Sequence, residues 1–267
     1  MRTIAQMLDL RGRVALVTGG AGHIGLALAE ALAELGTDIA ILDLDEEACR
    51  QASAQISASH DVRAMAVAAN LAEESEVLAV PKRVLGKMGH LDILVNCAAL
   101  VGTSDLEGWN APLLQQGSRA WRMALDVNLT APFLLTQACA EALASSRHGA
   151  VINVGSIYGM VGPSWDLYPG TGMANPAAYG ASKGGLLQLT RYMATCMAPA
   201  VRVNMLTPGG LVRAQPPVFI ERYNSRVPLG RMATEEDLKG AVAYLASDLS
   251  AYVTGHNLVV DGGWTVW

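Results

Sequence analysis

Short apolar runs alternate with longer helical stretches along nearly the whole chain. Each run is almost continuous in apolar and β-branched residues, which is typical of strands buried on both faces of a parallel sheet. Seven runs are predicted as strands: Val14–Thr18, Asp38–Leu42, Val62–Ala68, Ile93–Asn96, Ala150–Val154, Arg202–Leu206 and Asn257–Val260. Helical patterns fill the gaps between them. This β-α-β-α order predicts an α/β fold with a doubly wound, seven-stranded parallel sheet and helices on both faces.

Two stretches interrupt the alternation. Gly159–Asn175 contains several Gly and Pro residues, and Gly209–Arg226 is polar and proline-bearing. Ligands bind beyond the carboxyl ends of the strands in such sheets, so long irregular loops there are expected to be functional. The alternative is that both are surface insertions without a role. No linker or internal repeat divides the chain, which predicts one domain over residues 1–267.

Composition and charge exclude several classes of function. The formal net charge of −5 comes without a basic cluster, so no nucleic-acid partner is expected. No apolar run approaches the roughly 18–20 residues that a membrane helix needs, and Met1–Leu10 does not resemble a signal peptide. We therefore expect a cytoplasmic protein. The four cysteines and five histidines are scattered along the chain, which predicts no metal site.

A glycine-rich turn follows the first strand. Thr18–Gly25 leads into a helix expected over Leu26–Leu35, and glycines there let the backbone approach a pyrophosphate at the helix N-terminus. The second strand ends at Asp43, a carboxylate that would accept hydrogen bonds from the adenosine 2′-hydroxyl and repel a 2′-phosphate. Ala21, Gly22 and Leu44 offer no compensating cation. These residues favour NAD over NADP.

A second group of residues indicates acid–base chemistry. Tyr179 and Lys183 are four residues apart on a predicted helix, so they share one face. Asn175 is expected to be the N-cap of that helix and Pro176 its first residue. An ammonium close to a phenol is expected to lower the phenol pKa, so that the tyrosine can exchange a proton with an alcohol or ketone. Ser156 follows the fifth strand and is expected to hydrogen-bond the reacting oxygen.

Asn128 lies in a predicted helical stretch, Arg119–Ala144, with Pro132 four residues later. Because proline has no N–H to donate to the Asn128 carbonyl, the helix should kink there. That carbonyl is a candidate to hold a water in a proton relay reaching Lys183. The alternative is that Pro132 only shapes helix packing.

From Val14 to Gly263 the chain resembles the compact, single-domain branch of the short-chain dehydrogenase/reductase family. The resemblance implies a Rossmann-type fold and hydride transfer between a secondary alcohol and a ketone with NAD(H). It implies four catalytic residues, Asn128, Ser156, Tyr179 and Lys183. It also implies these cofactor contacts: Gly19, His23, Ile24, Gly25, Asp43, Leu44, Asn70, Leu71, Asn96, Ala98, Tyr179, Lys183, Pro208, Gly209 and Leu211.

The chain departs from the family pattern at a few positions. His23 stands where the family usually has glycine, and Asn70 where it more often has aspartate. Cys97 and Ala99 replace the usual Asn and Gly of the strand-four motif, and Arg213 stands where a threonine often contacts the carboxamide. No member of the catalytic set is missing.

The sequence leaves the substrate open. A polyol or sugar-like substrate is expected if the first irregular loop forms a polar, aromatic wall, and basic residues of the second loop are candidates to meet a carboxylate or phosphate. These residues are Trp165, Asp166, Tyr168 and Thr171, with Arg213, Gln215, Arg222 and Arg226. The alternatives are a 3-oxoacyl thioester reductase and a catalytically silent dinucleotide-binding regulator. The family resemblance further implies a homo-oligomer, a tetramer or dimer, that pairs helices Arg119–Ala144 and Ala178–Met193.

Overall fold

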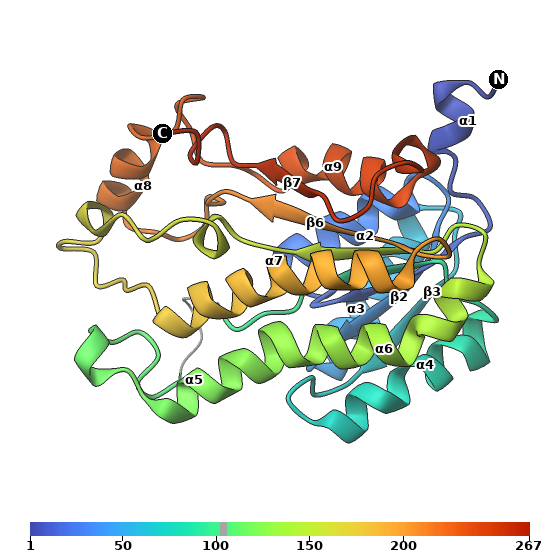
Figure 1. The fold of residues 1–267 in the computed structure, drawn as a ribbon, viewed down its shortest axis with the longest axis horizontal. Helices are drawn as coiled ribbons and strands as arrows, with labels where there is room; N and C mark the ends of the chain where they lie inside the picture. Colours follow the sequence, from blue (N-terminus) through green and yellow to red (C-terminus); the bar gives the residue numbers. More distant parts are fainter. Residues whose placement is uncertain (102–105) are drawn as a thin grey trace.

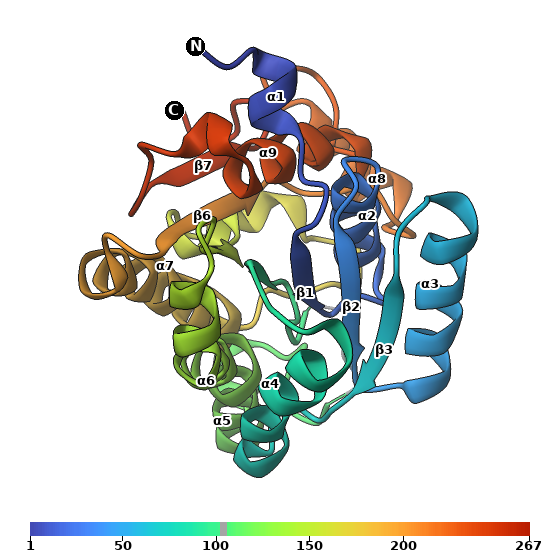
Figure 2. The same ribbon diagram turned by 90° about the vertical axis from the view of Figure 1, so that its right-hand side faces the viewer.

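The computed structural model describes residues 1–101 and 106–267. These residues contain one parallel sheet with the strand order β3-β2-β1-β4-β5-β6-β7, so the predicted doubly wound α/β fold is confirmed (Figure 2). The strands are β1 (Val14–Thr18), β2 (Asp38–Asp43), β3 (Ala64–Ala68), β4 (Ile93–Asn96), β5 (Ala150–Val154), β6 (Arg202–Pro208) and β7 (Asn257–Val260). Four strands have their predicted bounds. β3 begins two residues later than predicted, and β2 and β6 extend further, to Asp43 and Pro208.

Helices cover both faces of the sheet (Figures 1 and 2). The helices are α1 (Ile4–Leu8), α2 (His23–Ala33), α3 (Glu46–Ser59), α4 (Glu74–Met88), α5 (Ser118–Leu125), α6 (Ala131–Ser145), α7 (Ala177–Met197), α8 (Pro217–Asn224) and α9 (Glu236–Ala246). One buried apolar cluster joins α2, α3 and α9 to the sheet, and a second joins α4, α6 and α7. Strands β1, β4 and β5 are buried along their whole length between these layers. Their carboxyl ends are therefore held rigidly, and those ends carry the candidate site.

The predicted kink near Asn128 takes the form of a π-helical turn. Residues Asp126–Thr130 separate α5 from α6, and the Ala131 N–H donates to the Asp126 carbonyl, one residue further back than in an α-helix. Pro132 follows as the second residue of α6 and supplies no N–H to the Asn128 carbonyl. The single helical stretch expected from the sequence is thus two α-helices joined by a wider turn.

Two helices begin at other residues than expected, and one stretch expected to be irregular contains a helix. α2 begins at His23 rather than Leu26, because the glycine turn itself ends in helical geometry. α7 begins at Ala177 with Pro176 before it, and the Gln116 side chain, rather than Asn175, accepts the Ala177 N–H at 3.0 Å. The stretch Gly209–Arg226, expected to be irregular, contains α8, whose Phe219 and Tyr223 are buried in a small separate apolar cluster.

Candidate functional site

A cavity of about 1,360 Å³ lies at the carboxyl ends of the central strands. One end of it is bounded by the glycine turn and the end of β2, and the other by α8 and the loop before α7. Most of the residues expected to bind a cofactor or to act in catalysis line this cavity. They are Gly19, His23, Ile24, Gly25, Asp43, Leu44, Asn70, Leu71, Ala98, Ser156, Tyr179, Lys183, Pro208, Gly209 and Leu211. Thus one cavity joins the predicted cofactor end to the predicted chemical end.

The glycine turn is packed so tightly that side chains are excluded at two positions. Gly19 has a φ of +63°, and a Cβ atom there would lie 2.8 Å from the Cα of Ala98. A Cβ atom on Gly25 would lie 2.1 Å from the Gly19 carbonyl oxygen. His23, by contrast, is exposed at the start of α2 and also lines the cavity. The N-terminus of α2 is therefore open toward the cavity, as pyrophosphate binding requires.

Asp43 holds the end of β2 against the glycine turn. One carboxylate oxygen accepts the Ala21 N–H at 3.2 Å, and the other accepts the Leu44 N–H at 2.8 Å. Among the described residues no Lys, Arg or His forms an ion pair with Asp43. The carboxylate is thus fixed in place at the cavity with its negative charge unpaired.

Asn96, expected to be a cofactor contact, does not line the cavity. Its side chain is buried and donates to the side-chain oxygen of Asn153 at 2.8 Å and to the Thr136 hydroxyl at 3.3 Å. Asn153 in turn donates to the Thr190 hydroxyl at 2.8 Å. This polar chain ties β4 and β5 to α6 and α7, so in this structure Asn96 serves the framework. Thr18, which the sequence did not single out, performs the equivalent task nearer the cavity by accepting the Cys97 and Ala98 N–H groups.

Ser156, Tyr179 and Lys183 converge on the cavity from β5 and α7. The Ser156 hydroxyl accepts the Tyr158 N–H at 3.2 Å, and the Lys183 ammonium donates to the Val154 carbonyl at 2.8 Å. That ammonium lies 6.0 Å from the centre of the Tyr179 ring. The backbones are in close contact, because a Cβ atom on Gly159 would lie 2.7 Å from the Lys183 carbonyl carbon. The turn after β5 is thus seated directly on the helix that carries Tyr179.

The pKa of Tyr179 differs from the expectation. Burial raises it above its ordinary value of 10.0, and a hydrogen bond with Ser156 only partly offsets this increase. Lys183, expected to lower this pKa, does not contribute to the shift, and its ammonium donates to the Val154 carbonyl. Burial lowers the pKa of Lys183 itself to about 8. The phenol of Tyr179 is therefore neutral near pH 7, the form that can donate a proton.

Asn128 is fully buried beside the cavity rather than in its wall. Its side-chain oxygen accepts the Leu100 N–H at 2.7 Å, and its amide donates to the Leu100 carbonyl at 3.2 Å and to the Ser182 hydroxyl at 3.1 Å. Leu100 lines the cavity and Ser182 precedes Lys183 in α7. Asn128 thus fixes the segment after β4 against α7. The proton relay through its main-chain carbonyl stays a prediction.

The substrate end of the cavity differs from the polar wall expected. Of the loop residues proposed for that wall, only Tyr168 lines the cavity, because Trp165 is exposed and Asp166 forms an ion pair with Arg226 at 2.8 Å. Arg222 donates to two loop carbonyls instead of facing the cavity.

The apolar cluster of α8 supplies most of this wall, and Tyr223 stands out within it. The Tyr223 hydroxyl accepts the Gly210 N–H at 2.6 Å, and its ring stacks on Trp264 at a centroid distance of 4.2 Å. The sequence did not identify Tyr223, because only the tertiary structure brings α8 close to the C-terminus (Figure 1) and Tyr223 into contact with Gly210 and Trp264.

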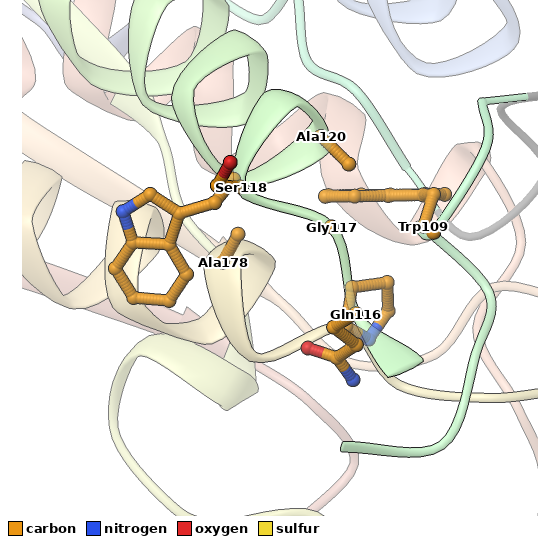
Figure 3. Close-up of a pocket in the computed structure, with 9 residues that line it drawn as sticks. Trp109, Gln116, Gly117, Ser118, Ala120 and Ala178 are labelled. Carbon is orange, nitrogen blue, oxygen red and sulfur yellow. The ribbon is translucent and has the colours of Figure 1, made fainter. Parts of the chain in front are cut away.

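A smaller cavity of about 270 Å³ lies at the start of α5. Figure 3 shows that it is bordered by Trp109, Gly117 and Ala120, with Ala178 contributed by α7. Trp109 is buried and donates its indole N–H to the Val101 carbonyl at 2.7 Å. This smaller cavity contains no titratable side chain among its lining residues.

Neither a membrane-spanning helix nor a metal-binding cluster is found among the described residues. No helix within residues 1–101 and 106–267 combines the length and the apolar character needed to cross a membrane. Over the same residues, His, Cys, Asp and Glu side chains nowhere gather in a group of three or more that could hold a metal ion.

Comparisons with known proteins agree with this architecture. A family model described as enoyl-(acyl carrier protein) reductase matches residues 19–265. The cis-4-hydroxycyclohexanecarboxylate dehydrogenase of Sinomonas cyclohexanicum is 36% identical over 258 residues, covering 95% of this chain and 96% of its own. A short-chain type dehydrogenase/reductase from Mycobacterium marinum superposes with a TM-score of 0.86 at 28% identity, over 99% of both chains. A gluconate 5-dehydrogenase from Burkholderia cenocepacia, solved with NADP and tartrate, gives 0.88 at 30% identity, over 99% of this chain and 100% of its own. The chain belongs to the short-chain dehydrogenase/reductase family.

Proposed function

We propose that this chain is an NAD(H)-dependent oxidoreductase that interconverts a secondary alcohol and a ketone. The observation that carries the proposal is the single cavity that holds the glycine turn and Asp43 at one end and Ser156, Tyr179 and Lys183 at the other. Proteins of this family bind a nicotinamide dinucleotide, whose ring accepts or supplies the hydride when bound. The glycine turn, Asp43, Leu44 and the Pro208–Leu211 segment would hold it.

The side chains of the chemical end have complementary tasks. The neutral Tyr179 phenol donates a proton to the oxygen of a ketone, and its phenolate accepts one from an alcohol. The Ser156 hydroxyl hydrogen-bonds the same oxygen and orients it. Lys183 donates to the Val154 carbonyl at 2.8 Å and so ties the helix that carries Tyr179 to the end of β5.

Asp43 is the reason for proposing NAD. Its carboxylate has no cationic partner among the described ion pairs, so the 2′-phosphate of NADP would meet an uncompensated negative charge. The gluconate dehydrogenase neighbour was solved with NADP, so membership of the fold does not choose between the two cofactors. The choice of NAD over NADP rests on Asp43.

A cofactor and substrate panel tests the reaction. NAD⁺ and NADP⁺ are each offered with cyclic secondary alcohols, polyols and hydroxy acids, and NADH and NADPH with the matching ketones and a 3-oxoacyl thioester. We expect turnover with NAD(H) and a secondary alcohol or ketone. Turnover confined to the thioester with NADPH would favour a 3-oxoacyl thioester reductase, a name that several relatives carry. NADH binding without any turnover would favour the dinucleotide-binding regulator.

Replacing Asp43 tests the cofactor assignment. Asp43→Asn removes the charge and keeps one acceptor oxygen, so one of the hydrogen bonds from the Ala21 and Leu44 N–H groups is retained. We expect the ratio of kcat/KM for NAD⁺ over NADP⁺ to fall by about tenfold or more, because the repulsion of the 2′-phosphate is lost. Asp61→Asn makes the same change of net charge at an exposed position and should leave the ratio unaltered. An unchanged ratio in Asp43→Asn would show that the ribose is recognised elsewhere.

We also propose a tetramer or dimer built on α5, α6 and α7. Large apolar side chains are exposed on these helices, namely Trp121, Phe133 and Tyr192, and association would cover them. Sedimentation velocity at micromolar concentration is expected to give a dimer or tetramer. A monomer under those conditions would contradict this assembly.

A further inference from the structure

Two tyrosine hydroxyls and an amide form a linked group at the substrate end of the cavity. The Tyr158 and Tyr168 hydroxyl oxygens lie 3.0 Å apart, and the Asn175 amide donates to the Tyr168 hydroxyl at 3.1 Å. All three residues line the cavity. Tyr158 belongs to the turn after β5, and the other two lie in the loop that precedes α7. The sequence did not predict that these three side chains are hydrogen-bonded to one another.

One phenol O–H hydrogen of this group has no acceptor among the described contacts. Each phenol carries one O–H hydrogen, and the Tyr158–Tyr168 hydrogen bond uses one of the two. The Asn175 amide supplies its own hydrogen, so it uses none from the phenols. Among the described contacts no third group accepts from either hydroxyl. Whichever tyrosine donates to the other, one O–H hydrogen remains for a ligand, and burying it unpaired is costly.

The group stands next to the reacting residues. A Cβ atom on Gly180, which follows Tyr179, would lie 3.1 Å from the Tyr158 carbonyl oxygen. The same turn carries Ser156, whose hydroxyl accepts the Tyr158 N–H. The two phenols line the same cavity as Ser156 and Tyr179, so one bound molecule can contact both groups.

The surrounding wall is apolar and offers no spare positive charge. Phe219, Met173 and Met232 line the cavity beside the tyrosines. The cationic side chains of the lining, apart from His23 at the glycine turn, are Lys183 and Arg213. Arg213 is neutralised by Glu235 at 2.8 Å, and residues 102–105, outside the description, include no Lys, Arg or His. An anionic group here would lose its hydration without gaining an ion pair.

We propose that the substrate is a neutral, largely apolar secondary alcohol or ketone with a second oxygen, which accepts a hydrogen bond from the Tyr158–Tyr168 pair. This inference rests on the proposed function, because it describes the molecule that Tyr179 and Ser156 act on. It narrows the substrate class in two ways, by requiring an acceptor away from the reacting carbon and by disfavouring a carboxylate or phosphate there.

Three ring ketones of similar size test the proposal with the whole protein and NADH. They are 4-hydroxycyclohexanone, 4-methylcyclohexanone and 4-oxocyclohexanecarboxylate, which place a hydroxyl, a methyl group and a carboxylate at the same position. We expect kcat/KM for the hydroxy ketone to exceed that of the other two by about tenfold or more, because only it satisfies the phenol without burying a charge. Equal values for the hydroxy and methyl ketones, or a preference for the carboxylate, would overturn the inference.

Variants separate recognition from a structural role. Tyr158→Phe and Tyr168→Phe, alone and combined, remove the hydroxyls and keep the rings, and the double variant should reduce the hydroxy-to-methyl ratio to about one. Its kcat/KM should fall much less for the methyl ketone than for the hydroxy ketone, and its Kd for NADH should not change. Tyr252→Phe, at a fully exposed tyrosine, is the matched control and should retain the preference. An equal loss with both ketones would mean that the pair only supports the fold. If no ketone or alcohol is turned over by the unaltered enzyme although NADH binds, the proposed function itself fails.

Discussion

Tyr179→Phe is expected to lower kcat for both ketone reduction and alcohol oxidation by about a hundredfold or more. The variant keeps the aromatic ring, which packs against the cluster of Trp109, Ala120 and Ala178, and removes only the hydroxyl. The protein would then have no proton donor at the position where Ser156 fixes the substrate oxygen. Steady-state kinetics with the best substrate of the panel measure the loss.

Binding measurements show whether the loss is chemical. The Kd for NADH, followed by its fluorescence, should stay within about twofold of the original value, because the cofactor contacts at the other end of the cavity are intact. Tyr252→Phe serves as the control for the substitution itself, since that tyrosine lies fully exposed away from the cavity. If Tyr179→Phe retained near-normal turnover, Tyr179 could not be the proton donor, and another acid in the cavity would have to be sought.

Gly25→Ala is expected to abolish tight cofactor binding and to destabilise the protein. Its methyl group would lie 2.1 Å from the Gly19 carbonyl oxygen, and the obstructing atoms belong to the backbone rather than to a flexible side chain. The glycine turn must then move away from α2, which costs about 1–3 kcal/mol or more. For a chain of this size each kcal/mol lowers Tm by about 2–4 °C. We expect a lower Tm and at least a tenfold weaker Kd for NADH, roughly 1.4 kcal/mol.

Gly86→Ala provides the matched control. Gly86 lies in α4, exposed, and a Cβ atom there would meet nothing within 4 Å. Because alanine is the better helix former, this variant should be slightly more stable, by about 0.5–1 kcal/mol. The two Gly→Ala changes thus have opposite expected signs. A Gly25→Ala protein that binds NADH as tightly as the original would show that the turn yields more easily than its packing indicates.

Much of the fold could be predicted because strands buried on both faces leave a clear signal. Nearly continuous apolar runs such as Ala150–Val154 have no alternative interpretation as exposed surface, and the residues that end them mark the carboxyl edge of the sheet. α8 was missed because the two prolines at its start, Pro216 before it and Pro217 as its first residue, and its mixed polarity resemble a loop, whereas the burial of Phe219 and Tyr223 that stabilises it depends on distant partners. The limits of α7 were misjudged because Gln116, far away in sequence, caps it.

In the candidate site too, features that follow from the strand topology could be predicted, whereas features that depend on distant partners could not. Residues that follow a strand or start a helix, such as Asp43 and Ser156, were placed correctly at the cavity, since their position follows from the topology. Asn96 also ends a strand, but its side chain points into the framework, a choice of face that no motif specifies. The partners of Asp166 and of Lys183 were likewise outside the reach of the sequence, because ion pairs and hydrogen bonds between loops depend on tertiary geometry.

The wall of the substrate end has its own apolar cluster, separate from the two clusters that hold the sheet. Its residues come from the turn after β5, the loop before α7, α8 and the C-terminal Trp264. Residues of this kind can be exchanged during evolution, or in the laboratory, while the strands and the proton-transfer residues stay as they are. Libraries directed at these segments should therefore yield enzymes with altered substrate range and undiminished expression. The residues proposed for proton transfer and the residues that line the substrate end therefore belong to separately packed parts of the molecule.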